Sequence, residues 1–185
     1  IITKVNMIFM SFVIGISQGI QPIIGFNYGA AKYTRVRKTY LLALATATAL
    51  SFVAFGCFQL FPRQIISVFG KGSELYFQFS ERYFRIYMFL TLINGIQPVT
   101  SNFFNSIGKS SLGVFMSLTR QILFLLPLII VFPIFMGIDG VMYAGPIADA
   151  ATGIFCGIFT IRELKELKTL SYTSENAAAA SGSAN

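Results

Sequence analysis

The 185-residue sequence contains no histidine and only two cysteines, and these shortages exclude several classes of function. Without histidine, triad catalysis, zinc-dependent hydrolysis and most general-base mechanisms lose the side chain on which they usually depend. Cys57 and Cys156 show no CxxC spacing and have no second pair that would complete a metal site. The sequence therefore predicts a protein that is not an enzyme and that holds no metal or resident cofactor.

Charged residues are also scarce, at 11% of the chain, whereas a soluble domain carries about 25%. Hydrophobic residues make up 55%, and the mean hydropathy is +0.69. Because so few charges cannot cover a water-exposed surface, we expect membrane lipid to surround the chain. The net charge of +7 comes from basic residues at the ends of apolar runs, where they set topology, so nucleic acid is not expected as a partner.

Five apolar runs are each long enough to cross the ~30 Å hydrocarbon core as a helix of about 20 residues. They cover residues 5–24, 40–60, 86–104, 112–135 and 140–161. The sequence thus predicts an all-α membrane protein, a polytopic helical bundle over 1–170, followed by a disordered polar tail over 171–185. Because the first run starts almost at Ile1, which is not methionine, we expect the chain to be the later part of a longer protein.

Basic residues concentrate in the connections that fall on one side of this bundle. The segment 32–38 holds four of them and no acid, Lys109 follows the third run, and Arg162, Lys165 and Lys168 follow the fifth. The connections on the opposite side mix basic with acidic residues. The positive-inside rule therefore predicts that the basic side and the carboxyl terminus are cytoplasmic.

A tetrapeptide recurs at equivalent places in two runs that cross in the same direction, as Gly19-Ile20-Gln21-Pro22 and as Gly95-Ile96-Gln97-Pro98. Proline removes an intrahelical hydrogen bond and bends a span, and lipid offers the freed carbonyls no partner. The prolines expected to bend helices are Pro22, Pro98, Pro127 and Pro146.

Several amides lie within or close to the two repeats. Amides in a span can line a polar cavity, or they can hold helices together through interhelical hydrogen bonds. For the set as a whole we favour a cavity that receives substrate. Its predicted lining residues are Gln18, Gln21, Asn27, Asn94, Gln97 and Asn102.

Two charges lie deep in the predicted spans. Counting ~1.5 Å per residue, Arg120 lies about 12 Å and Asp149 about 16 Å above the cytoplasmic edge, on neighbouring antiparallel runs. An unpaired charge at that depth costs at least ~2.5–3.5 kcal/mol. We therefore predict an Arg120–Asp149 ion pair or a shared hydrogen-bond network.

The segment GISQGIQPIIGFNYGA at 15–30, the basic loop after it and PIAD at 146–149 resemble the multidrug and toxin extrusion (MATE) family, in its MepA-like bacterial branch. The resemblance covers residues 1–170. It implies that the five runs correspond to helices eight to twelve of a twelve-helix transporter, within its carboxyl-terminal lobe. The missing amino-terminal lobe of the same protein would then be a partner of this chain.

The resemblance also implies an activity. Family members exchange cationic or amphipathic small molecules for sodium ions or protons by alternating access of two lobes, here in the bacterial cytoplasmic membrane. Some members carry an acidic residue in the helix that matches the third run, but 92–97 contains none. The coupling ion, sodium or proton, is therefore expected to bind mainly outside this chain. Two alternatives stay open: a lipid-linked oligosaccharide flippase of the same superfamily, and a non-transporting membrane scaffold.

Overall fold

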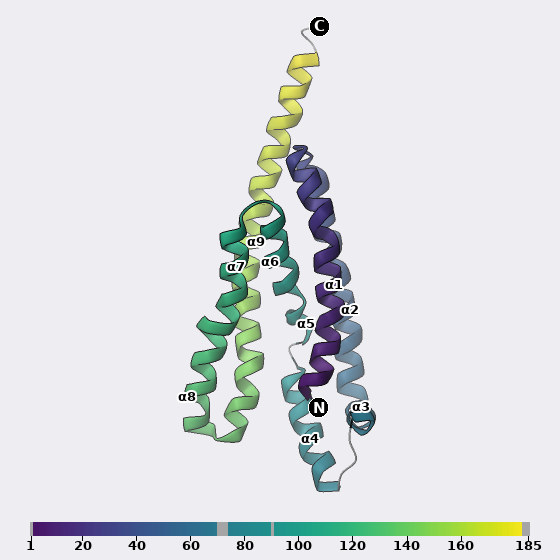
Figure 1. The fold of residues 1–185 in the computed structure, drawn as a ribbon, viewed down its shortest axis with the longest axis vertical. Coiled ribbons are helices and arrows are strands. Elements are labelled where there is room, and N and C mark those ends of the chain that lie inside the picture. Colours follow the sequence, from purple (N-terminus) through teal and green to yellow (C-terminus); the bar gives the residue numbers. More distant parts are fainter. Residues whose placement is uncertain (1, 70–73, 90, 183–185) are drawn as a thin grey trace.

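The computed structural model describes residues 2–69, 74–89 and 91–182, and every regular element within these ranges is a helix. In chain order these are α1 (Ile2–Gly29), α2 (Tyr33–Leu60), α3 (Pro62–Phe69), α4 (Glu74–Tyr87), α5 (Thr91–Asn94), α6 (Ile96–Ser106), α7 (Ser110–Leu118), the π-helical segment η1 (Thr119–Leu125), α8 (Leu126–Met136) and α9 (Ile138–Gly182). Figure 1 shows α1 and α2 on one side of an elongated bundle, α7 and α8 on the other, and α5 and α6 between them. The prediction of an all-α membrane fold is confirmed.

Four helical stretches of the described chain are long and apolar enough to cross a membrane, namely Thr3–Gly29, Tyr33–Leu60, Ser110–Met136 and Tyr143–Thr173. They contain most of the first, second, fourth and fifth predicted spans. Their outer surfaces expose many large apolar side chains, and none of the α8 residues is buried. A helix that is apolar all round requires lipid or another apolar surface around it.

The third predicted span, 86–104, is not one continuous helix. After α4 come the four-residue α5, a turn at Gly95, and then α6. Pro98 lies in the first turn of α6, where its missing N–H costs no intrahelical bond that would otherwise form. Pro98 therefore marks the beginning of a helix and does not bend a longer one.

The other prolines behave differently from one another. α1 and α9 continue without interruption through Pro22 and Pro146. Pro127 is the second residue of α8 and lies two residues after the π-helical segment ends. Leu126, between them, donates its N–H to the Gln121 carbonyl five residues back. Because Pro127 cannot donate to the carbonyl four residues before it, the helix widens there to a π turn.

The core of the bundle lies where α1 and α2 meet α6, with Val13, Tyr40 and Phe103 fully buried. The hairpin of α6 and α7 is especially close, since a Cβ added to Gly113 would lie 2.8 Å from the Ser101 carbonyl oxygen. The Ser101 hydroxyl donates to the Gly113 carbonyl at 2.7 Å. Glycine at 113 therefore sets how closely α6 and α7 approach each other.

The predicted disordered tail differs from the structure over 171–182, where α9 continues as a helix to Gly182. The run of alanines at 177–180 explains this extension, because alanine has the highest intrinsic helix propensity. Residues 183–185 of the predicted tail lie outside the described residues.

Candidate functional site

The structure brings together the two charges deep in the spans. Arg120, from the π-helical segment, donates through Nε to Oδ1 of Asp149 on α9 at 2.5 Å. The Asp149 side chain is only 5% exposed, and that of Arg120 is 24% exposed. The pair therefore has the character of a buried ion pair, in which each partner supplies the countercharge that lipid cannot.

A small cavity of about 10 Å³ adjoins this ion pair, with room for about one water molecule. Asn94 and Gln97 line it together with both charged residues. The Asn94 amide also lies within hydrogen-bonding reach of the Asp149 carboxylate. Asn94 ends α5 and Gln97 is the second residue of α6, so the break at Gly95 presents both amides to the charges.

A second polar cluster joins α1 to α6. Gln21 donates through Nε2 to Oδ1 of Asn102 at 2.7 Å, and Asn102 donates through Nδ2 to the Ser17 hydroxyl at 2.7 Å. Ser17 in turn donates to the Ile14 carbonyl at 3.0 Å. Each of these bonds has a protein partner, so this cluster is typical of the interhelical bonds that hold a bundle together.

The six amides predicted as one lining set therefore do not form a single cluster. Asn94 and Gln97 line the cavity beside the ion pair, and Gln21 and Asn102 bond to each other between helices. Asn27 donates to the Ile23 carbonyl of its own helix at 2.7 Å, and Gln18 is exposed on α1. The last two belong to neither cluster.

Sequence reasoning did not single out a buried group of hydroxyls. The Tyr40 hydroxyl lies between the hydroxyls of Thr100 and Thr160, at 3.0 and 3.1 Å, and so connects α2, α6 and α9. Tyr40 is fully buried. The spacing of these residues could not have predicted the group. Tyrosine and threonine hydroxyls also occur in apolar runs where they bond only to the backbone of their own helix.

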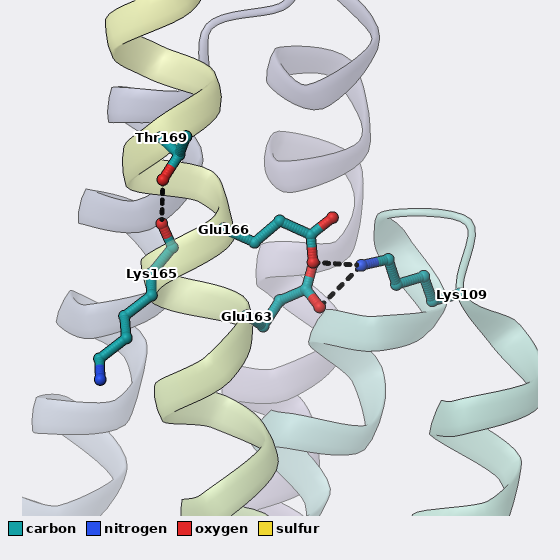
Figure 2. Close-up of polar contacts among 5 residues, drawn as sticks. All are labelled: Lys109, Glu163, Lys165, Glu166 and Thr169. Carbon is teal, nitrogen blue, oxygen red and sulfur yellow. Dashed lines mark hydrogen bonds and ion pairs between the residues drawn. The ribbon is translucent and has the colours of Figure 1, made fainter.

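Another polar cluster lies at the basic end of the bundle, which we define as the α1–α2 turn, the α6–α7 turn and residues 162–172 of α9. Figure 2 shows Lys109 of the α6–α7 turn pointing toward two carboxylates of α9. The Lys109 ammonium lies 2.7 Å from Oε1 of Glu163 and 3.2 Å from Oε2 of Glu166. Desolvation lowers the pKa of Lys109, but the hydrogen bonds to both glutamates and the attraction of their charges together outweigh it, and the net pKa is raised.

The two glutamates were not predicted as site residues. Their spacing of three along α9 places them on one face of the helix, which was the available signal. The Glu163 side chain is only 7% exposed, so Lys109 is its principal source of countercharge among the described residues.

The fold of the chain matches solved transporters. Over 85% of the chain, it is 36% identical to the MATE multidrug transporter DinF-BH, whose structure was solved as a complex with a bound compound, with a TM-score of 0.79. An inward-facing MATE family transporter of the MOP superfamily matches 91% of the chain at 16% identity and a TM-score of 0.81. A MATE structure in the bent conformation matches 92% at 17% identity and a TM-score of 0.82, and this likeness, like the previous one, shows the fold alone.

The chain spans only part of these proteins, covering 35% of DinF-BH, 39% of the inward-facing transporter and 38% of the bent structure. No curated protein sequence is significantly similar to the chain. The model of the MatE family matches residues 1–131, which is well over half of the 185 residues. By this match the chain belongs to the MatE family of membrane transporters.

Proposed function

We propose that this chain forms most of the carboxyl-terminal lobe of a secondary active multidrug transporter. The transporter exports cationic or amphipathic compounds in exchange for sodium ions or protons, by alternating access of two lobes. The observation that carries the proposal is the ion pair of Arg120 and Asp149 beside the amides of Asn94 and Gln97, at a break in a span. Such interrupted helices carry polar groups to the midplane in secondary transporters.

The similarity to DinF-BH supports the substrate class, since that protein is a multidrug transporter. A buried carboxylate attracts organic cations, and a paired arginine keeps it satisfied while no substrate is present. In this mechanism an incoming cation competes with Arg120 for Asp149. The apolar walls of the neighbouring helices then accommodate the rest of an amphipathic molecule.

The coupling ion binds mainly outside this chain in our proposal. Residues 92–97, at the interrupted span, contain no acidic side chain that could serve as a separate cation ligand. The amino-terminal lobe supplies the principal ion site and the other wall of the cavity. No resident cofactor takes part.

The orientation of the chain in the membrane follows from the position of its basic residues. The basic end faces the cytoplasm of a bacterium, with the carboxyl terminus on the same side, because basic residues near the ends of spans are retained there. The exposed apolar surface of the bundle, including α8, is covered by lipid and by the amino-terminal lobe.

Drug accumulation in a bacterial strain that lacks its own efflux pumps tests the proposal. Cells that express the full-length gene should accumulate less ethidium than control cells, and Gln97→Ala and Asn94→Ala should restore accumulation. Gln18→Ala provides the matched control, because this amide is exposed and belongs to neither cluster. Equal accumulation in all variants with normal membrane expression would remove Asn94 and Gln97 from the substrate path. If the unmodified protein also fails to lower accumulation, the flippase and scaffold alternatives become preferable.

A further inference from the structure

A groove of about 660 Å³ lies at the basic end, between the beginning of α2 and residues 167–172 of α9. It is far larger than the cavity beside the ion pair and shares no lining residue with it. None of the residues proposed for transport contributes to it. Its function is therefore a separate question.

The charge of the groove is of one sign. Arg37 and Lys38 from α2 and Lys168 from α9 line it, and no acidic residue does. None of the ion pairs formed within the described chain involves these three cations. The nearby acids of α9, Glu163 and Glu166, are both paired with Lys109. The groove thus presents positive charge without an internal countercharge from the described side chains.

The wall of the groove that lies further along α2 is apolar. Leu41 and Leu42 also line it, and Leu42 is 67% exposed. At a rise of ~1.5 Å per residue, Leu41 lies about 6 Å deeper along the span than Arg37. Tyr172 adds an aromatic ring next to Lys168, whose ammonium lies 5.9 Å from the ring centroid, and such rings are typical of the membrane interface.

This order of groups matches one kind of molecule. A phospholipid has an anionic phosphate at the level of the helix ends and acyl chains that begin immediately deeper. A small soluble anion would satisfy the cations but would leave the leucines against water. Basic pockets between transmembrane helices on the positively charged side commonly bind anionic lipid headgroups.

We propose that this groove is a binding site for an anionic phospholipid. The phosphate lies between Arg37, Lys38 and Lys168, and the acyl chains run along Leu41 and Leu42. The bound lipid connects the beginning of α2 to the end of α9, which otherwise meet there around an open groove. The proposal requires the chain to be embedded in a membrane, but it does not depend on the transported substrate or on the coupling ion.

Lipid binding to the full-length protein, purified in uncharged detergent and measured by native mass spectrometry, tests the site. The probes are phosphatidylglycerol, phosphatidylcholine with the same acyl chains, and soluble glycerol phosphate. We expect phosphatidylglycerol to bind at least tenfold more tightly than the other two. Each basic residue near an anionic lipid contributes roughly fivefold in affinity, so R37Q/K38Q/K168Q should weaken phosphatidylglycerol binding about 100-fold.

A control variant with the same loss of charge is available at the same end. Lys32, Arg35 and Lys165 are exposed and do not line the groove, so K32Q/R35Q/K165Q should weaken phosphatidylglycerol binding far less than R37Q/K38Q/K168Q, because water and salt screen their charges. Leu42→Gln keeps every charge but makes the apolar wall polar, and it should weaken phosphatidylglycerol binding severalfold even if the triple variant does not fold.

Three results would overturn the proposal. The first is an equal loss of affinity in the two triple variants, which would indicate diffuse attraction to the whole basic end. The second is binding of glycerol phosphate as tight as that of phosphatidylglycerol, which would indicate a site for a soluble anion. The third is no preference of the unmodified protein for phosphatidylglycerol, which is the outcome expected if another segment of the full-length protein fills the groove.

Discussion

Arg120 Nε lies 2.5 Å from Asp149 Oδ1, and the arginine reaches this position from the only π-helical segment in the described part of the chain. A π turn contains more residues than an α turn, so it changes the direction in which the following side chains point. The segment ends at Leu125, two residues before Pro127. The ion pair and the proline therefore lie at opposite ends of the same irregular stretch of helix.

Replacing either partner of this pair should destabilise the protein, because the other charge is left buried without a countercharge. Breaking a buried ion pair in this way costs about 3–5 kcal/mol, whereas removing both partners costs much less. Arg120→Ala and Asp149→Ala should each lower the melting temperature in detergent, and the double variant should recover part of the loss. Strictly additive losses would show that the two side chains do not interact in the folded protein.

The two amide clusters should respond differently to mutation. Asn102→Ala removes the bonds to both Gln21 and Ser17, and at about 0.6 kcal/mol for each interhelical bond it should lower stability by about 1 kcal/mol. Gln97→Ala should change stability less and transport more, since Gln97 lines the cavity beside the charges. Melting temperature and drug accumulation, measured on the same variants, separate the two effects. If Asn102→Ala impairs transport more than Gln97→Ala does and leaves stability unchanged, then Asn102 serves transport and its structural role is wrong.

The fold and the ion pair could be predicted from the sequence because both depend on simple periodicities. Long apolar runs define spans, and a constant rise per residue places Arg120 and Asp149 at similar depth on antiparallel neighbours. The roles of the amides could not be separated in this way. Whether Gln21 meets Asn102 depends on which helices are adjacent, and an asparagine such as Asn27 can also bond within its own helix.

The break in the third span shows a second limit of sequence reasoning. A proline in an apolar run is compatible with a bent helix and also with the first turn of a new one. Pro98 has the second arrangement, and Gly95 just before this helix lies so close to α2 that an added Cβ would be 2.9 Å from the Ser51 hydroxyl. Such a close approach is a property of the packed helices and leaves no mark in the hydropathy of the run.

Gly113→Ala should destabilise the hairpin of α6 and α7. The added Cβ would lie 2.8 Å from the Ser101 carbonyl oxygen, and backbone atoms cannot move aside without shifting the helix. We expect a loss of about 1–3 kcal/mol, as for overpacked cores, seen as a lower melting temperature. Gly56→Ala is the matched control, because nothing lies within 4 Å of its added Cβ and alanine favours the helix. Equal effects of the two substitutions would contradict the close approach of α6 and α7.

The contact of Lys109 with Glu163 and Glu166 should stabilise the basic end over a defined pH range. The pKa of Lys109 is higher in the folded protein than its ordinary value of about 10.4, so the stabilisation is fully present below that pH. It is lost as the pH rises further, through the raised pKa, because the ammonium is then neutralised. Lys109→Gln should remove it at every pH and cost about 2 kcal/mol, since the buried Glu163 loses a charged hydrogen-bond donor.

Lys165→Gln is the control for this prediction, because Lys165 lies on the same helix but is exposed and points away from the two carboxylates (Figure 2). Melting temperatures of both variants and of the unmodified protein, measured between neutral pH and about pH 11, would show the difference. The unmodified protein should approach the stability of Lys109→Gln only at the upper end of this range, while Lys165→Gln should follow the unmodified protein throughout. A constant difference between the unmodified protein and Lys109→Gln across the whole range would mean that the charge of Lys109 is not what stabilises the contact.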